Sequence, residues 1–154
     1  MPTTTASATL KWDVLVTNRQ GLTRDLPPGK EHTDTDHTTC LHVPSADLVV
    51  AGDAAYNEVH LYLAESNAET RREWIAALDT VESLKPRTVI AGHKKPEKND
   101  SPRIIEETRQ YIRDFDRLAE MTTTARELYD KMLQLYPNRA NPGSLWGSAR
   151  AAKP

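Results

Sequence analysis

Short apolar runs separated by turn-forming residues occupy the chain up to about residue 91. Three of these runs are bounded by Pro, Ser and Gly, a pattern typical of short buried strands rather than of helical turns. In an earlier run, Trp12, Val14 and Val16 alternate with other residues and share one face. The pattern therefore predicts strands over residues 10–16, 38–43, 47–51 and 87–91.

Helical spacing of apolar residues appears between the last two predicted strands and again after them. The predicted helices cover residues 66–84, a segment from Ser101 to at least Leu118, and residues 124–136. Ser66 with Glu69, and Thr124 with Glu127, have the spacing of capping boxes. Because the first helix joins two strands, it is the crossover expected in a layered α/β fold, and the ends of both strands should lie on the same side.

The composition is that of an ordinary single-domain protein. Hydrophobic residues make up 38% and charged residues 27% of the 154 residues, and the net charge of −2 offers no basic face for nucleic acid. No apolar run is long enough to span a membrane, and residues 1–9 lack the pattern of a secretion signal. We therefore expect a cytoplasmic protein with no nucleic-acid or membrane partner.

The expected domain covers residues 10–136. Residues 1–9 should form a flexible tail, and residues 137–154, rich in Asn, Pro, Gly, Ser and Ala, a surface tail anchored by Leu145 and Trp146. Cys40 is the only cysteine, so no intrachain disulfide can form. Its place in a predicted strand favours a buried structural thiol over a nucleophile.

Ligand-type side chains accompany three of the apolar runs. The segment HTDTDH, from His32 to His37, precedes one run, and VVAGD and VIAGH end at Asp53 and His93. A Gly before the last two lets the backbone turn sharply. Imidazole and carboxylate groups are usual ligands of Zn²⁺ or Fe, so three such residues at one sheet edge predict part of a metal site. The alternative is a hydrogen-bonded histidine and an ordinary turn aspartate.

The segment HTDTDHTTCLHVPSADLVVAGDAAYN, followed by a helix and then RTVIAGHKKP, resembles the second half of the metallo-β-lactamase superfamily. This resemblance implies a partial αββα sandwich, with a mixed sheet and flanking helices. Residues 10–16 resemble the opening strand of that fold, although residues 1–31 could instead be unrelated to it. The superfamily's HxHxDH motif is absent from this chain, and its usual Gly before the first ligand histidine is Glu31 here.

The resemblance also implies a site that binds one or two zinc ions. Carried over by position, the metal ligands fall on His32, Asp53 and His93. Asp34, Asp36 and His37 are then reserve ligands or partners that orient the ligands.

The function implied by the resemblance is metal-dependent hydrolysis of a small ester, lactone, thioester or β-lactam. Asp53 and Tyr56 would be the catalytic residues, with Tyr56 donating a hydrogen bond to a carbonyl oxygen or leaving group; the alternative for Tyr56 is a packed aromatic ring. Because most of the superfamily's ligands are missing, we expect weak activity or none. The alternative function is a non-catalytic remnant that self-associates, most simply as a homodimer, to cover exposed sheet edges.

Overall fold

A mixed four-stranded sheet forms the centre of the described structure. The computed structural model describes residues 13–16, 33–34 and 38–153. In these residues the strand order is β1-β2-β3-β4, with β1, β2 and β3 antiparallel and β3 parallel to β4. The strands are β1 (Asp13–Val16), β2 (Thr39–Val43), β3 (Leu48–Asn57) and β4 (Thr88–Lys94). The predicted α/β class and mixed sheet are therefore confirmed.

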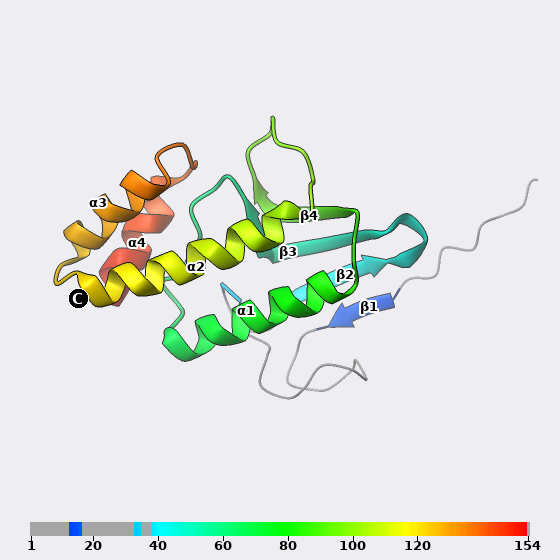
Figure 1. Cartoon of the computed structure of the whole chain (residues 1–154), viewed down its shortest axis with the longest axis horizontal. Coiled ribbons are helices and arrows are strands. Elements are labelled where there is room, and N and C mark those ends of the chain that lie inside the picture. The colour runs from blue at the N-terminus through cyan, green and yellow to red at the C-terminus, as the bar shows by residue number, and fades with distance from the viewer. Residues whose placement is uncertain (1–12, 17–32, 35–37, 154) are drawn as a thin grey trace, which may run out of the picture.

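Two long helices cover one face of this sheet. Figure 1 shows α1 and α2 running side by side across the strands, with α3 and α4 packed together beyond one end of the sheet. The helices are α1 (Ala68–Ser83), α2 (Arg103–Met121), α3 (Ala125–Leu135) and α4 (Pro142–Ala152), and a short 3₁₀ helix covers Pro44–Ala46. Helix α1 connects the parallel strands β3 and β4, so it is the predicted crossover.

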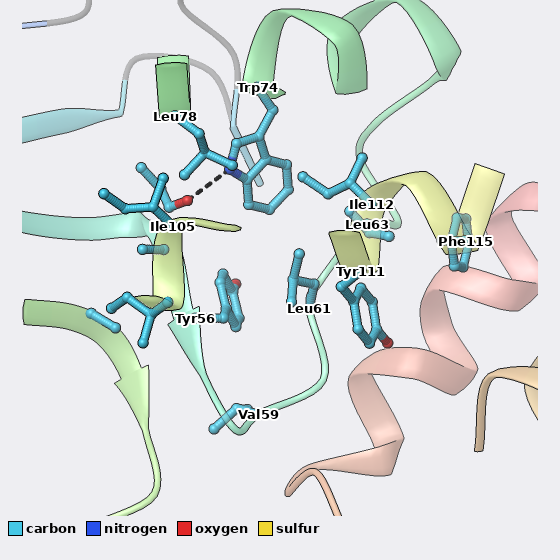
Figure 2. Packing of buried hydrophobic residues seen from close by; sticks show 14 of the residues in the cluster. Tyr56, Val59, Leu61, Leu63, Trp74, Leu78, Ile105, Tyr111, Ile112 and Phe115 are labelled. Atoms are coloured by element: carbon cyan, nitrogen blue, oxygen red, sulfur yellow. Dashed lines mark hydrogen bonds between the residues drawn. The ribbon is translucent and has the colours of Figure 1, made fainter. Parts of the chain in front are cut away.

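The core lies between the sheet and the two long helices. Buried residues alternate along β3 up to Ala51 and along β4 up to Ala91, and the apolar residues of α2 that recur at helical spacing are buried in the same cluster. On the opposite face of the sheet, Leu41, Val50 and Ile90 occupy neighbouring register positions and are only half-buried. The buried cluster includes Val49, Ala51, Val89 and Ala91 of the strands and Trp74, Leu78, Ile105, Ile112 and Phe115 of the helices. Figure 2 labels these five helix residues.

The helix starts agree with the sequence in one case and differ in another. Helix α3 has the predicted capping box, with Thr124 accepting from the Glu127 amide. In α1 the predicted pair of Ser66 and Glu69 is wrong, because Asn67 is the N-cap and accepts from the amides of Glu69 and Thr70. Asparagine is at least as good an N-cap as serine, so the cap lies one residue later.

The predicted C-terminal tail is wrong over Pro142–Ala152, which form helix α4. Leu145 is fully buried, as expected of an anchor, whereas Trp146 is 39% exposed and packs edge-on against Tyr129. The Ser148 hydroxyl also accepts a 2.8 Å hydrogen bond from the Leu63 amide. Helix α4 is therefore joined to the core by packing and by hydrogen bonding. Residues 1–9 lie outside the described structure, and no described helix is both long and apolar enough to cross a bilayer.

Cys40 has the predicted structural role. It is buried on β2, its thiol contacts the Ala51 carbonyl at 3.4 Å, and burial raises the pKa of the thiol to about 11. A thiol that stays protonated at neutral pH is a poor nucleophile.

Candidate metal centre

The parallel strands β3 and β4 bring Asp53 and His93 together. Asp53 Oδ1 lies 3.2 Å from His93 Nε2, and both side chains are half-exposed to solvent. The sequence predicted that these residues follow the ends of their strands, but β3 and β4 continue past them to Asn57 and Lys94. The strands extend further because the ladder between Tyr56 and His93 and between Asn57 and Lys94 continues the pairing beyond the apolar run.

Two glycines make the approach of the two side chains possible. Gly52 has a φ of 54°, in the left-handed region that favours glycine, and the β3–β4 register shifts on either side of it. Such irregularities redirect side chains along a strand. A Cβ added at Gly92 would lie 2.4 Å from Asp53 Oδ1 and 2.9 Å from the Gly52 carbonyl carbon. The Asp53 carboxylate therefore occupies the space that a side chain at position 92 would fill.

Asp34 completes a cluster of three ligand-type side chains. One ligand atom each from Asp34, Asp53 and His93 lie within 4.8 Å of one another. Asp34 is buried, whereas the other two face solvent, so the cluster has a buried inner member and an accessible outer side. Two carboxylates and an imidazole at this separation can serve as ligands of one divalent cation.

Tyr56 connects two of these three residues. Its hydroxyl donates a 3.0 Å hydrogen bond to Asp34 Oδ2, and its ring stacks on the His93 imidazole with centroids 4.8 Å apart. Burial raises the pKa of Tyr56 well above its ordinary value, and the Asp34 carboxylate raises it further. The phenol is therefore protonated at neutral pH and available as a donor.

The resemblance implied a catalytic role for Tyr56, with a packed aromatic ring as the alternative. In the structure the residue is 2% exposed and its hydroxyl donates to Asp34, which favours a role in holding the site over contact with a substrate. The catalytic assignment of Asp53 and Tyr56 stays a prediction. Asp53, by contrast, is open to solvent.

The remaining predicted ligands divide into two groups. His32, Asp36 and His37 lie outside the described residues, so their roles stay predictions. Asp34 was predicted as a reserve ligand or orienting partner, and its carboxylate lies within the cluster, so its role as a ligand stays a prediction. The sequence signal for Asp34 was its place in HTDTDH, but nothing in that pattern distinguishes it from its neighbours.

Other polar residues near these strands have structural partners. Lys94 forms a 2.7 Å ion pair with Asp100, and Lys95 donates to the Asn138 carbonyl at 2.6 Å. His60, in the segment after β3, is fully buried against the Tyr111 hydroxyl. None of these three side chains belongs to the cluster that the described residues form around Asp53.

The fold and the cluster together define a class of protein: a layered α/β protein with a candidate metal centre at two parallel strands. The chain belongs to the metallo-beta-lactamase superfamily, whose family model matches residues 9–93. The resemblance inferred from the sequence is therefore confirmed.

A solved structure shows the same fold. The chain is similar to a metallo-beta-lactamase family protein from Thermus thermophilus, with 22% sequence identity and a TM-score of 0.54. The match covers 79% of this chain and 40% of that one, so this chain spans less than half the length of that relative. No curated protein matches the chain.

Proposed function

We propose that this chain binds a divalent metal ion, zinc in the first instance, through Asp34, Asp53 and His93. The convergence of these three side chains within 4.8 Å carries the proposal. Zinc is the ion usually bound in the superfamily to which the chain belongs. His32, which the resemblance to the superfamily implies as a ligand, is proposed as a further one.

The residues present fit such an ion. Oxygen and nitrogen donors of this kind are those that Zn²⁺ accepts, and three protein ligands leave a position open to a substrate. The absence of any side chain at Gly92 keeps the Asp53 carboxylate beside His93. The two carboxylates together also match the charge of a divalent ion.

We propose hydrolysis of a small ester, lactone, thioester or β-lactam as the reaction. A bound divalent ion supplies a Lewis acid that polarises a carbonyl group and makes water nucleophilic near neutral pH. The half-exposed side of Asp53 and His93 is where a substrate can approach, while the buried Asp34 stays out of its reach. Because the chain has no HxHxDH segment, we expect slow turnover.

Metal binding by the purified chain tests this proposal. Titration with Zn²⁺ or Co²⁺ should give one bound ion per chain, and His93→Ala and Asp53→Asn should abolish binding. His32→Ala should weaken it. His42→Ala is a matched control, because this half-buried histidine on β2 lies outside the cluster and should leave binding unchanged. A wild-type chain that binds no ion at micromolar concentrations would overturn the proposal.

We favour this function over the non-catalytic remnant because the ligand-type residues converge rather than point into different surroundings. Self-association as a homodimer remains a separate prediction. The sheet face with Leu41, Val50 and Ile90 is half-buried in a single chain, and light scattering during size-exclusion chromatography would measure the oligomeric state.

A further inference from the structure

We propose that Tyr56 is the positioning residue of the metal centre, holding the Asp34 carboxylate through its hydroxyl and the His93 imidazole through its ring. This inference rests on the proposed metal site. In this role Tyr56 orients two proposed metal ligands, Asp34 and His93, and does not itself contact the substrate.

Tyr56 is well suited to this role because its surroundings fix it in place. Thr108 on α2 hydrogen-bonds to both ends of the residue, accepting from the Tyr56 amide at 3.1 Å and donating to its carbonyl at 3.2 Å. The ring also packs against the ring of Trp74, with the two ring centroids 6.2 Å apart. Trp74 is itself fully buried and donates a 2.8 Å hydrogen bond to the Ala54 carbonyl, drawn dashed in Figure 2. The tyrosine therefore has little freedom to move.

The two ligands that Tyr56 contacts need such support for different reasons. Asp34 lies in no helix or strand, and its carboxylate accepts a hydrogen bond from the hydroxyl of Tyr56, which lies 22 residues later in the sequence. His93 is on β4 opposite Tyr56 in the strand register, but its side chain is half-exposed, and the stacked ring limits its orientation. Partners that orient metal ligands in this way typically change metal affinity by about 10–100-fold.

The central test is Co²⁺ titration of the full chain and of Tyr56→Phe, followed by visible absorption. Phenylalanine keeps the ring and its stacking but removes the Tyr56 donor to Asp34 Oδ2, while the Thr33 hydroxyl, 3.3 Å from Asp34 Oδ1, remains. We expect an affinity about 10–100-fold lower and an altered cobalt spectrum. Tyr129→Phe is the matched control, because Tyr129 lies on α3 and packs against Trp146, so the loss of its hydroxyl should change neither quantity.

A double-mutant cycle distinguishes positioning from a general effect on the fold. If Tyr56 acts through Asp34, then Tyr56→Phe should have little further effect on affinity once Asp34→Asn is present. Additive losses would overturn the inference. A second variant, Thr108→Val, keeps the phenol but releases the Tyr56 backbone, and should weaken Co²⁺ binding even if Tyr56→Phe fails to fold.

The outcomes separate this inference from the proposed function. Wild-type affinity and spectrum in Tyr56→Phe would overturn the positioning role while leaving the metal site intact. A wild-type chain that binds no Co²⁺ would overturn the metal site itself, and the positioning role with it.

Discussion

Acidification should destabilise this protein through His60, which is buried as a neutral imidazole. Its Nδ1 lies 2.9 Å from the Tyr111 hydroxyl, and its Nε2 has no hydrogen-bond partner among the described residues. Burial, and secondarily the Arg139 guanidinium, lowers the pKa of His60 from 6.5 to about 4. The guanidinium lies 4.8 Å from the Tyr111 ring centroid, so protonating His60 would add a second cation to this buried cluster.

The magnitude follows from the difference between the folded and unfolded states. Below pH 6.5 the unfolded chain binds a proton at His60, whereas the folded chain does not until about pH 4, so stability falls as the pH is lowered through this window. At about 1.4 kcal/mol per pKa unit, the loss from this one residue is on the order of 3 kcal/mol by pH 4.

Urea unfolding of the wild type and of His60→Gln, from pH 7.5 down to pH 4, measures this contribution. Glutamine does not titrate, but it can still accept a hydrogen bond from the Tyr111 hydroxyl. The unfolding free energy of the variant should therefore fall less between pH 7.5 and pH 4 than that of the wild type. The half-buried His42 provides the control variant, His42→Gln, which should follow the wild type. Equal losses in wild type and His60→Gln would refute the reasoning.

Two glycine substitutions should act in opposite directions. Gly92→Ala should lower the unfolding free energy by about 1–3 kcal/mol and should also lower the Co²⁺ affinity, because the added Cβ would displace the Asp53 carboxylate and press on the Gly52 backbone. A variant with both the unfolding free energy and the Co²⁺ affinity of the wild type would contradict this expectation. Gly147→Ala, inside α4 where an added Cβ meets nothing within 4 Å, should raise the unfolding free energy by about 0.5–1 kcal/mol, and a lower thermal midpoint would contradict that expectation.

Features that depend on local periodicity could be predicted from the sequence. The buried stripe of α2 and the capping box of α3 each lie within a few helical turns, so the spacing of residues such as Thr124 and Glu127 contains the needed information. The crossover between β3 and β4 could also be predicted, because an amphipathic helix between two apolar runs has few other places to pack.

Features that depend on tertiary contacts could not be predicted in the same way. Helix α4 is rich in small residues, and its sequence resembles a loop. It is held by the burial of Leu145 and by the hydrogen bond between Ser148 and Leu63, 85 residues apart. Strand β3 likewise continues through Asp53, where the apolar pattern stops, because β4 continues to pair with it. Tertiary context overrode local propensity in both cases.

The candidate site shows the same division between local and tertiary information. Asp53 and His93 could be identified because each follows a Gly at a strand, and the parallel pairing of β3 with β4 then brings them together. Asp34 lies in the cluster and accepts hydrogen bonds from the Tyr56 and Thr33 hydroxyls. A buried carboxylate needs such donors, because an isolated charge is costly to remove from water. A divalent ion would offset the same cost. The donor from Tyr56 and the proposed ion would therefore stabilise the same arrangement. Tyr56→Phe should accordingly lower the unfolding free energy of the metal-free protein at least as much as that of the protein with Co²⁺ added, as urea unfolding would measure.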